Sequence, residues 1–248
     1  MTEKCYWCGR DATSKEHVPP KCLFPEDKDI KSIYEETFRR SLVTVPACDE
    51  HNLAKSHDDE YLMVCLGARM GNNGVAYVHT HTKIKRAIER NPNLIQIQRE
   101  NKLNISGREF PALLVHIDTY RLMRSFEAIA RALVFYEFSF CYKGRCQVIS
   151  DIFFSPKDFK STNFQVKSAQ LLSEERKQWK TDNKGDNPKI FTYQFSGLDI
   201  FGTFTVALTF YEKTIVYVIM SLLDDTTFQK VKKQLKPQMD QFLDECDH

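Results

Sequence analysis

Two pairs of metal-binding residues constrain the fold of this chain more than any other feature of its sequence. In "CYWCG", Cys5 and Cys8 are separated by two residues, and in "ACDEHN", Cys48 and His51 have the same spacing. Three thiolates and one imidazole form a complete tetrahedral ligand set for a structural Zn²⁺ ion, with no position open for chemistry. The alternative is that all four are ordinary small core residues. Two matched pairs are more specific than one, and small units often need a metal to fold, so we expect a zinc site.

The N-terminus and the cysteine usage bear on the compartment. The first residues, "MTEKCYWCGR", lack the apolar stretch of a signal peptide, and no run of about 18 apolar residues occurs in the chain. We therefore expect a cytoplasmic protein without a membrane partner, in which thiols stay reduced. The other cysteines show no comparable partner spacing: Cys22, Cys65, Cys141, Cys146 and Cys246.

The segment "ARMGNNGVAY", residues 68–77, marks a break in the chain. Two glycines flank a pair of asparagines after an apolar helical stretch, and Gly and Asn tolerate the positive φ that ends helices. We place a boundary near residue 74, between a zinc-containing unit at 1–74 and a larger domain at 75–248. In the first unit we expect a strand at 41–45 and a helix at 50–69.

The sequence of the larger domain predicts an α+β fold. Apolar residues at helical spacing predict a long core helix at 118–139, after a short helix at 83–90 and a strand at 94–98. The segment 226–243 has an apolar face, with Pro237 as a kink, and we expect this helix to pack on a sheet. That antiparallel sheet is predicted from four segments rich in β-branched and aromatic residues: 147–155, 189–197, 200–211 and 213–222.

The stretch "SKEHVPP" lies between the two ligand pairs and places Glu16 and His17 directly before Val18 and two prolines. Asn52 follows the last zinc ligand at the start of the expected helix, so we expect Glu16, His17 and Asn52 to converge. Carboxylate and amide oxygens are hard ligands for Mg²⁺. A neutral imidazole beside them can take a proton from water near neutral pH. Together these groups are suited to activating water against a phosphodiester.

The order of these motifs, "CYWCG", "SKEHVPP" and "LVTVPACDEHNLAKS", resembles the HNH endonuclease family over about the first quarter of the chain. The resemblance implies a ββα-metal fold with a structural zinc. By this resemblance His17 is the general base, while Glu16 and Asn52 are ligands of a catalytic Mg²⁺ or Mn²⁺ ion. The structural zinc ligands that it implies are Cys5, Cys8, Cys48 and His51.

The chain departs from the family pattern at three places. His51 stands where the family usually has a cysteine, which is chemically acceptable in a zinc site. Arg40 or Ser41 falls where the family has an Asn or His that braces the loop carrying the base. Pro46 and Ala47 lengthen the link from the strand to Cys48 by one residue.

Basic and hydroxyl side chains near these motifs are candidates for nucleic-acid contacts. Lys55 and Ser56 lie one turn into the expected helix, and Lys83 and Arg86 share a face of the next short helix with Arg90. The alternative for all of them is a solvated surface position.

Two acidic and two histidine side chains are weaker candidates for metal binding. Asp58 or Asp59 can add a carboxylate ligand, although Asp near a helix N-terminus is also favoured by the helix dipole. His79 and His81 are two residues apart, but no third ligand lies nearby in the sequence, so we interpret them as helix-start or surface residues.

The leading functional hypothesis is a metal-dependent endonuclease that hydrolyses phosphodiester bonds, most simply in DNA, as an effector in bacterial phage defence. The net charge of +2 excludes a global basic field, so a nucleic acid has to be attracted locally. One alternative is a zinc-stabilised nucleic-acid-binding module without cleavage. Another is a nuclease gated by a regulatory partner protein, and residues 75–248 can serve recognition, homodimerisation or regulation.

Overall fold

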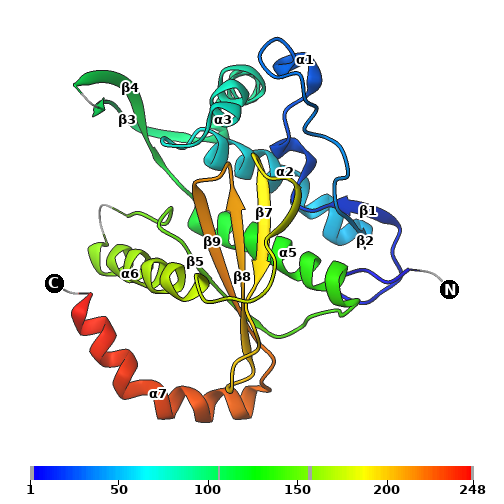
Figure 1. The fold of residues 1–248 in the computed structure, drawn as a ribbon, viewed down its shortest axis with the longest axis vertical. Coiled ribbons are helices and arrows are strands. Elements are labelled where there is room, and N and C mark those ends of the chain that lie inside the picture. Colours follow the sequence, from blue (N-terminus) through cyan, green and yellow to red (C-terminus); the bar gives the residue numbers. More distant parts are fainter. Residues whose placement is uncertain (1–2, 106, 156–157, 247–248) are drawn as a thin grey trace.

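A computed structural model describes residues 3–105, 107–155 and 158–246. It contains helices together with antiparallel sheets, so the expected mixture of helices and antiparallel strands is confirmed. Figure 1 shows the N-terminal elements at one side of the central sheet and the C-terminal helix at the opposite end. Among the described residues, no helix combines the length and apolarity needed to cross a bilayer.

The N-terminal part is a short hairpin followed by a helix. Strand β1 (Ser14–His17) pairs antiparallel with β2 (Thr44–Ala47), and α2 (Asp49–Gly67) begins directly after them. The long connection between the strands holds two short helices, η1 (Lys21–Leu23) and α1 (Asp27–Ile30). The strand predicted at 41–45 therefore lies slightly later in the chain, at Thr44–Ala47.

The predicted break after α2 coincides with a change of element. Helix α2 ends at Gly67, and Asn73 caps the next helix by accepting a hydrogen bond from the Ala76 amide. The helical path that follows is longer than the short helix predicted at 83–90. It consists of α3 (Gly74–His79), η2 (Thr80–Ile84) and α4 (Lys85–Arg90), with η3 (Pro92–Leu94) after it.

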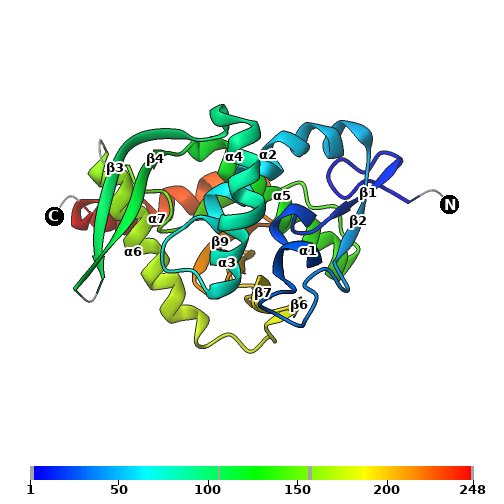
Figure 2. The same ribbon diagram turned by 90° about the horizontal axis from the view of Figure 1, so that it is seen from above.

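A two-stranded hairpin extends from the body beyond these helices. It is formed by β3 (Gln96–Ile105) and β4 (Arg108–His116), which pair antiparallel. Figures 1 and 2 show it as an arm that points away from the central sheet. The strand predicted at 94–98 is the start of this arm.

The five-stranded antiparallel sheet has the strand order β5-β9-β8-β7-β6. Its strands are β5 (Arg145–Ile149), β6 (Lys184–Asn187), β7 (Phe191–Phe195), β8 (Thr203–Phe210) and β9 (Thr214–Ser221).

Helices cover both faces of this sheet, as the side-chain alternation of β9 shows. Val216, Val218 and Met220 belong to the core that includes α5 (Thr119–Phe138). Tyr217 and its partly buried neighbours Ile215 and Ile219 pack with residues of α6 (Phe159–Arg176). Because successive strand residues point to opposite faces, α5 and α6 lie on opposite sides of the sheet. In Figure 1, α5 runs behind the strands.

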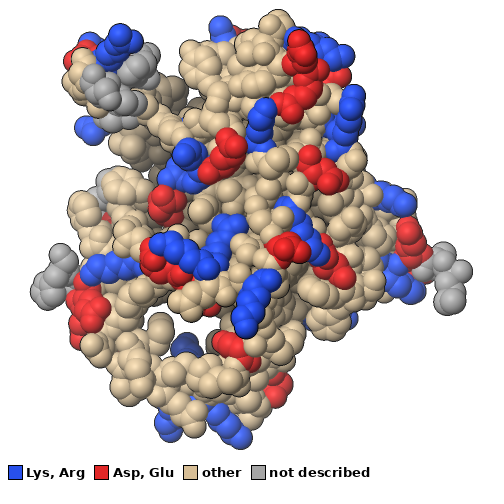
Figure 3. Space-filling view, viewed as in Figure 1, with Lys and Arg blue, Asp and Glu red and all other residues tan. Residues whose placement is uncertain are grey.

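The expectation that the last helix packs on the sheet is wrong. Helix α7 (Asp225–Glu245) has no buried side chain. Arg145 binds Asp225 at the first turn, while Phe242 packs against Phe164 of α6 near the other end. Leu235 and Met239, on the apolar face between these two contacts, are exposed. Figure 1 shows the helix bent, and Figure 3 shows an opening between this region and the body.

One hydrophobic core contains residues from both sides of residue 74. Tyr6 and Leu62 of the N-terminal part belong to the same buried cluster as Phe126 of α5 and Val206 of the sheet. The division at residue 74 therefore stays a prediction about the organisation of the chain, and the two parts pack together.

Candidate metal centre

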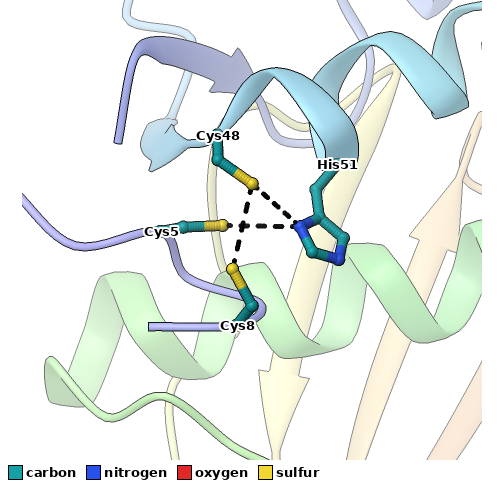
Figure 4. Close-up of side chains that lie close together, drawn as sticks. All are labelled: Cys5, Cys8, Cys48 and His51. Carbon is teal, nitrogen blue, oxygen red and sulfur yellow. Dashed lines mark hydrogen bonds between the residues drawn. The ribbon is translucent and has the colours of Figure 1, made fainter. Parts of the chain in front are cut away.

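Four side chains from two distant segments gather at the N-terminal corner. The ligand atoms of Cys5, Cys8, Cys48 and His51 all lie within 4.8 Å of one another. Figure 4 shows the three sulfurs and the His51 Nδ1 pointing toward a common centre. The sequence prediction of a cluster that can hold a metal ion is confirmed.

The spacing of these atoms fits zinc. On a tetrahedron, a zinc–sulfur distance of about 2.3 Å places two sulfurs about 3.8 Å apart, and a nitrogen at about 2.0 Å lies about 3.5 Å from a sulfur. The Cys8 and Cys48 sulfurs are 3.8 Å apart. His51 Nδ1 lies 3.0 Å from the Cys48 sulfur and 3.9 Å from that of Cys5. Donor type and spacing are therefore compatible with a structural Zn²⁺ ion.

Local backbone structure presents each ligand pair. The first pair lies on a tight turn in which the Gly9 amide donates to the Cys5 carbonyl at 2.9 Å. Gly9 adopts φ of 76°, a conformation that glycine reaches without strain. The second pair brackets the start of α2, where extended Cys48 precedes the first turn and His51 lies within it. Both pairs are therefore held by local hydrogen bonding.

Arg10 is a contributor that the sequence analysis missed. Its Nε donates to the Cys8 sulfur at 3.4 Å, and its guanidinium also pairs with Glu50. Burial acts to raise the pKa of Cys8, but the hydrogen bonds from Arg10 outweigh it and the pKa falls to about 7. Burial raises the pKa of the Cys5 thiol. The signal in the sequence is a cation two residues after the second cysteine, where it stabilises the thiolate that binds metal.

Glu16 lies in the interior beside the hairpin. Glu16 is only 6% exposed, and it lies opposite Val45 in the register of the hairpin. Burial, the charge of Glu16 and hydrogen bonding to it raise the pKa of Tyr6 well above its usual value, with a smaller contribution from Asp59. Glu16 and Asp59 therefore bring two carboxylates to the region of the Tyr6 hydroxyl.

His17 ends β1 and has a different environment. It lies opposite Thr44, and it is half-buried. Burial lowers its pKa below 6.5, and the positive charges of Lys21 and Arg39 lower it further. The imidazole is therefore mainly neutral at pH 7, which is the form that accepts a proton.

Asn52 approaches the same strand from α2. Its Nδ2 donates to the Ser14 hydroxyl at 2.9 Å. Ser14 and Glu16 share one face of β1, whereas His17 belongs to the other, because strand side chains alternate. The structure therefore brings Asn52 to the face that carries Glu16, and His17 extends from the end of the strand.

The two acidic candidates of α2 have different partners. Asp58 accepts a hydrogen bond from Arg121 of α5 at 2.8 Å, so it serves the packing of the two helices. Asp59 contributes to the electrostatic environment of Tyr6 together with Glu16. Of the two, Asp59 is the carboxylate that acts on Tyr6 together with Glu16.

Two of the basic candidates for nucleic-acid contacts form ion pairs with acidic side chains. Lys83 pairs with Glu26 at 3.3 Å, and Arg86 pairs with Asp29 at 2.7 Å. Lys55 and Ser56 lie among residues 53–57 of α2, whose side chains are outside the described part of the chain.

The two histidines after the break are not brought together. His79 is fully buried at the end of α3, so its interpretation as a helix-start or surface residue is wrong, and its Nδ1 lies 3.2 Å from the Tyr211 hydroxyl. Burial lowers its pKa to about 3. His81 packs against the ring of Tyr77 instead, with ring centroids 4.4 Å apart.

Comparisons of the chain with protein-family models, with curated proteins and with solved structures found no match.

Proposed function

We propose that this protein is a metal-dependent endonuclease of the ββα-metal type that hydrolyses phosphodiester bonds, with DNA as its substrate. The observation that carries the proposal is the order and position of its parts. A hairpin with Glu16 and His17 at one strand end leads into α2, and the zinc-type cluster joins the helix start to the N-terminal turn. The resemblance of the same segments to HNH endonucleases supports this interpretation.

In this proposal the two metal ions have separate tasks. Zinc at the cluster of three cysteines and one histidine is a structural brace, because all four positions are filled by protein ligands. Glu16 and Asn52 hold Mg²⁺ or Mn²⁺, with Asp59 as a further oxygen donor. Their carboxylate and amide oxygens suit a hard cation. When bound, that cation stabilises charge on the phosphate and the leaving oxygen.

His17 acts as the general base. It removes a proton from the attacking water, and its lowered pKa keeps the imidazole in the accepting form at neutral pH. Lys21 and Arg39 supply the positive charges beside it, and these also favour the approach of a phosphate. The remaining part of the chain is proposed to recognise DNA or a regulatory partner, in the setting of phage defence.

A second candidate function is nucleic-acid binding without cleavage. The burial of Glu16 beside Tyr6 favours it, because a ligand for a catalytic ion has to be reached by both the ion and the substrate. In that case the zinc-braced hairpin serves only as a scaffold for binding.

Cleavage of supercoiled plasmid, single-stranded DNA and RNA with Mg²⁺, Mn²⁺ or EDTA tests the proposal. The compared variants are His17→Ala and His81→Ala, since His81 is an exposed histidine packed on Tyr77, away from the proposed site. We expect metal-dependent cleavage by the wild type and His81→Ala, and a loss of about 10²- to 10⁴-fold in His17→Ala. Equal rates in the two variants contradict the role of His17. DNA binding without cleavage under any metal supports the second candidate.

A further inference from the structure

A buried arginine of α5 lies near the metal corner, the cluster formed by Cys5, Cys8, Cys48 and His51. Arg131 is 9% exposed, and its guanidinium carbon lies 4.9 Å from the centre of the Trp7 ring. Trp7 is located between Cys5 and Cys8 in sequence and stacks on His51, with centroids 5.6 Å apart and an interplanar angle of 29°. A continuous stack therefore runs from α5 to a ligand of the metal cluster.

The position of this guanidinium is fixed by hydrogen bonds on several sides. Its Nε and Nη2 donate to Glu127 at 2.8 and 2.7 Å. Its Nη1 donates to the Tyr142 carbonyl at 2.6 Å, and Nη2 also donates to the Gly144 carbonyl at 2.9 Å. The Tyr142 ring lies 5.1 Å from the guanidinium carbon. These bonds fix the orientation of the planar Arg131 guanidinium, whereas an exposed cation without such bonds would be mobile.

A second contact from the same region reaches the cysteine turn. The Cys141 thiol donates to the Trp7 carbonyl at 3.4 Å. This contact and the ring stack constrain both the backbone and the side chain of Trp7. The turn that carries two ligands is thus fastened to residues more than 120 positions later in the chain.

The Trp7 ring stacks on the His51 imidazole. A cavity of about 40 Å³ lies beside it, lined by His51, Asp58, Ser125 and other side chains. Trp7 lines the same cavity, so the imidazole borders both this cavity and the ring stack. Figure 4 shows Nδ1 turned toward the sulfurs and the other ring nitrogen turned away.

We propose that Arg131 is a positioning residue of the metal site. It holds Trp7 against the His51 imidazole, so that Nδ1 faces the three sulfurs. All four ligands of the metal site come from residues before 74, and a residue after this position supports their geometry. This role goes beyond the proposed nuclease function and does not depend on it, because it concerns metal retention alone.

Release of zinc to a coloured chelator, measured on full-length protein below its unfolding transition, tests this role. Arg131→Met removes the planar cation and keeps a side chain of similar length. Arg145→Met is the matched control, because Arg145 also stacks on a ring, that of Phe228 at 5.0 Å, and pairs with Asp225. We expect Arg131→Met to weaken zinc binding by about 10- to 100-fold, the range for outer partners of metal ligands. Arg145→Met should bind zinc as the wild type does.

Cobalt substitution separates positioning from general stability. The visible absorption of Co²⁺ reports the ligand geometry, so Arg131→Met should alter the spectrum, Arg131→Lys should restore it in part, and Arg145→Met should leave it unchanged. Zinc affinity and cobalt spectrum equal to wild type in folded Arg131→Met overturn the proposal.

If Arg131→Met does not fold, Trp7→Phe and Trp7→Leu take its place. Trp7→Phe keeps an aromatic ring that can contact the guanidinium and the imidazole, whereas Trp7→Leu removes it. Faster zinc release from Trp7→Leu than from Trp7→Phe supports the stack, and equal release rates overturn it. Cleavage is not measured in any of these experiments, so a failure of the nuclease proposal does not affect them.

Discussion

The metal corner and the Glu16–His17 strand end lie close in sequence, yet they differ in how their geometry is determined. In the metal corner, four ligand atoms point at one centre within 4.8 Å of one another. At the strand end, Glu16 is buried beside Tyr6, while His17 lies in the field of Lys21 and Arg39.

This difference shows when the spacing of residues in the sequence is enough to determine the geometry of a site. Two ligands separated by two residues on a tight turn or a helix start are brought together by the local backbone alone. Adjacent residues on a strand point to opposite faces, so their joint action depends on what packs around the end of the strand. We expect changes at the metal cluster to alter stability, and changes at Glu16 and His17 to alter cleavage.

The largest effect is expected for Cys48→Ala, which removes a zinc ligand. Structural zinc contributes about 10–16 kcal/mol in small zinc peptides, which is comparable to the whole stability of a typical domain. We expect this variant to lose zinc and to unfold at least its N-terminal part, as measured by elemental analysis and circular dichroism. Cys65→Ala, at a half-buried cysteine outside the cluster, should keep its zinc and lose about 1 kcal/mol. Equal stability of the two variants would show that the cluster is not a brace.

Glu16→Gln tests the other corner, because it keeps the shape of the side chain and removes its charge. If Glu16 holds the catalytic cation, the Mg²⁺-dependent cleavage rate should fall by roughly 30-fold, equivalent to about 2 kcal/mol of transition-state stabilisation, while zinc stays bound. The control is Glu36→Gln, at an exposed carboxylate that pairs with Lys189. Wild-type Mg²⁺ dependence in Glu16→Gln would remove this residue from the site.

The pH dependence of cleavage should report the His17 environment. Because burial, Lys21 and Arg39 lower its pKa below 6.5, the protonated and inactive form should accumulate only below that pH. The rate should therefore be level at neutral pH and fall on the acid side. Lys21→Gln removes one positive charge, so the acid limb should move to higher pH in a pH–rate profile. An acid limb that stays unchanged in Lys21→Gln contradicts this account.

The smallest effect is expected for Lys83→Gln and Arg86→Gln. Both side chains already pair with acidic groups, Glu26 and Asp29, so any contact with a phosphate requires these pairs to open. We expect each change to alter the salt dependence of DNA binding by less than the roughly 0.9 units that one full phosphate contact contributes. A change of a full unit would place that side chain directly on the backbone of the nucleic acid.

The sequence predicted the metal cluster, the long helix α5 and four strands of the five-stranded sheet because these follow from local patterns, but it did not predict α6 or β6. Alternating β-branched and aromatic residues predicted the antiparallel strands, and the apolar spacing of α5 predicted the long core helix. Arg131 was not predicted, because nothing in its local sequence connects it with Trp7. That contact exists only through the packing of α5 on the N-terminal turn.

The wrong prediction that α7 packs on the sheet has a related cause. The spacing of Phe228 and Phe242 predicted an apolar face, and both residues do contact the body at the ends of the helix. A hydrophobic pattern predicts that a helix has such a face, but it does not state which surface covers it or along what length. Leu235 and Met239, in the middle of the same face, are exposed.

The zinc content of the purified, folded wild-type chain tests the central claim most directly. Elemental analysis should find about one zinc per chain, and removal of that zinc by a strong chelator should lower the thermal stability of the protein measured on the same sample. Folded protein that contains no zinc, and whose stability the chelator leaves unchanged, would contradict the account.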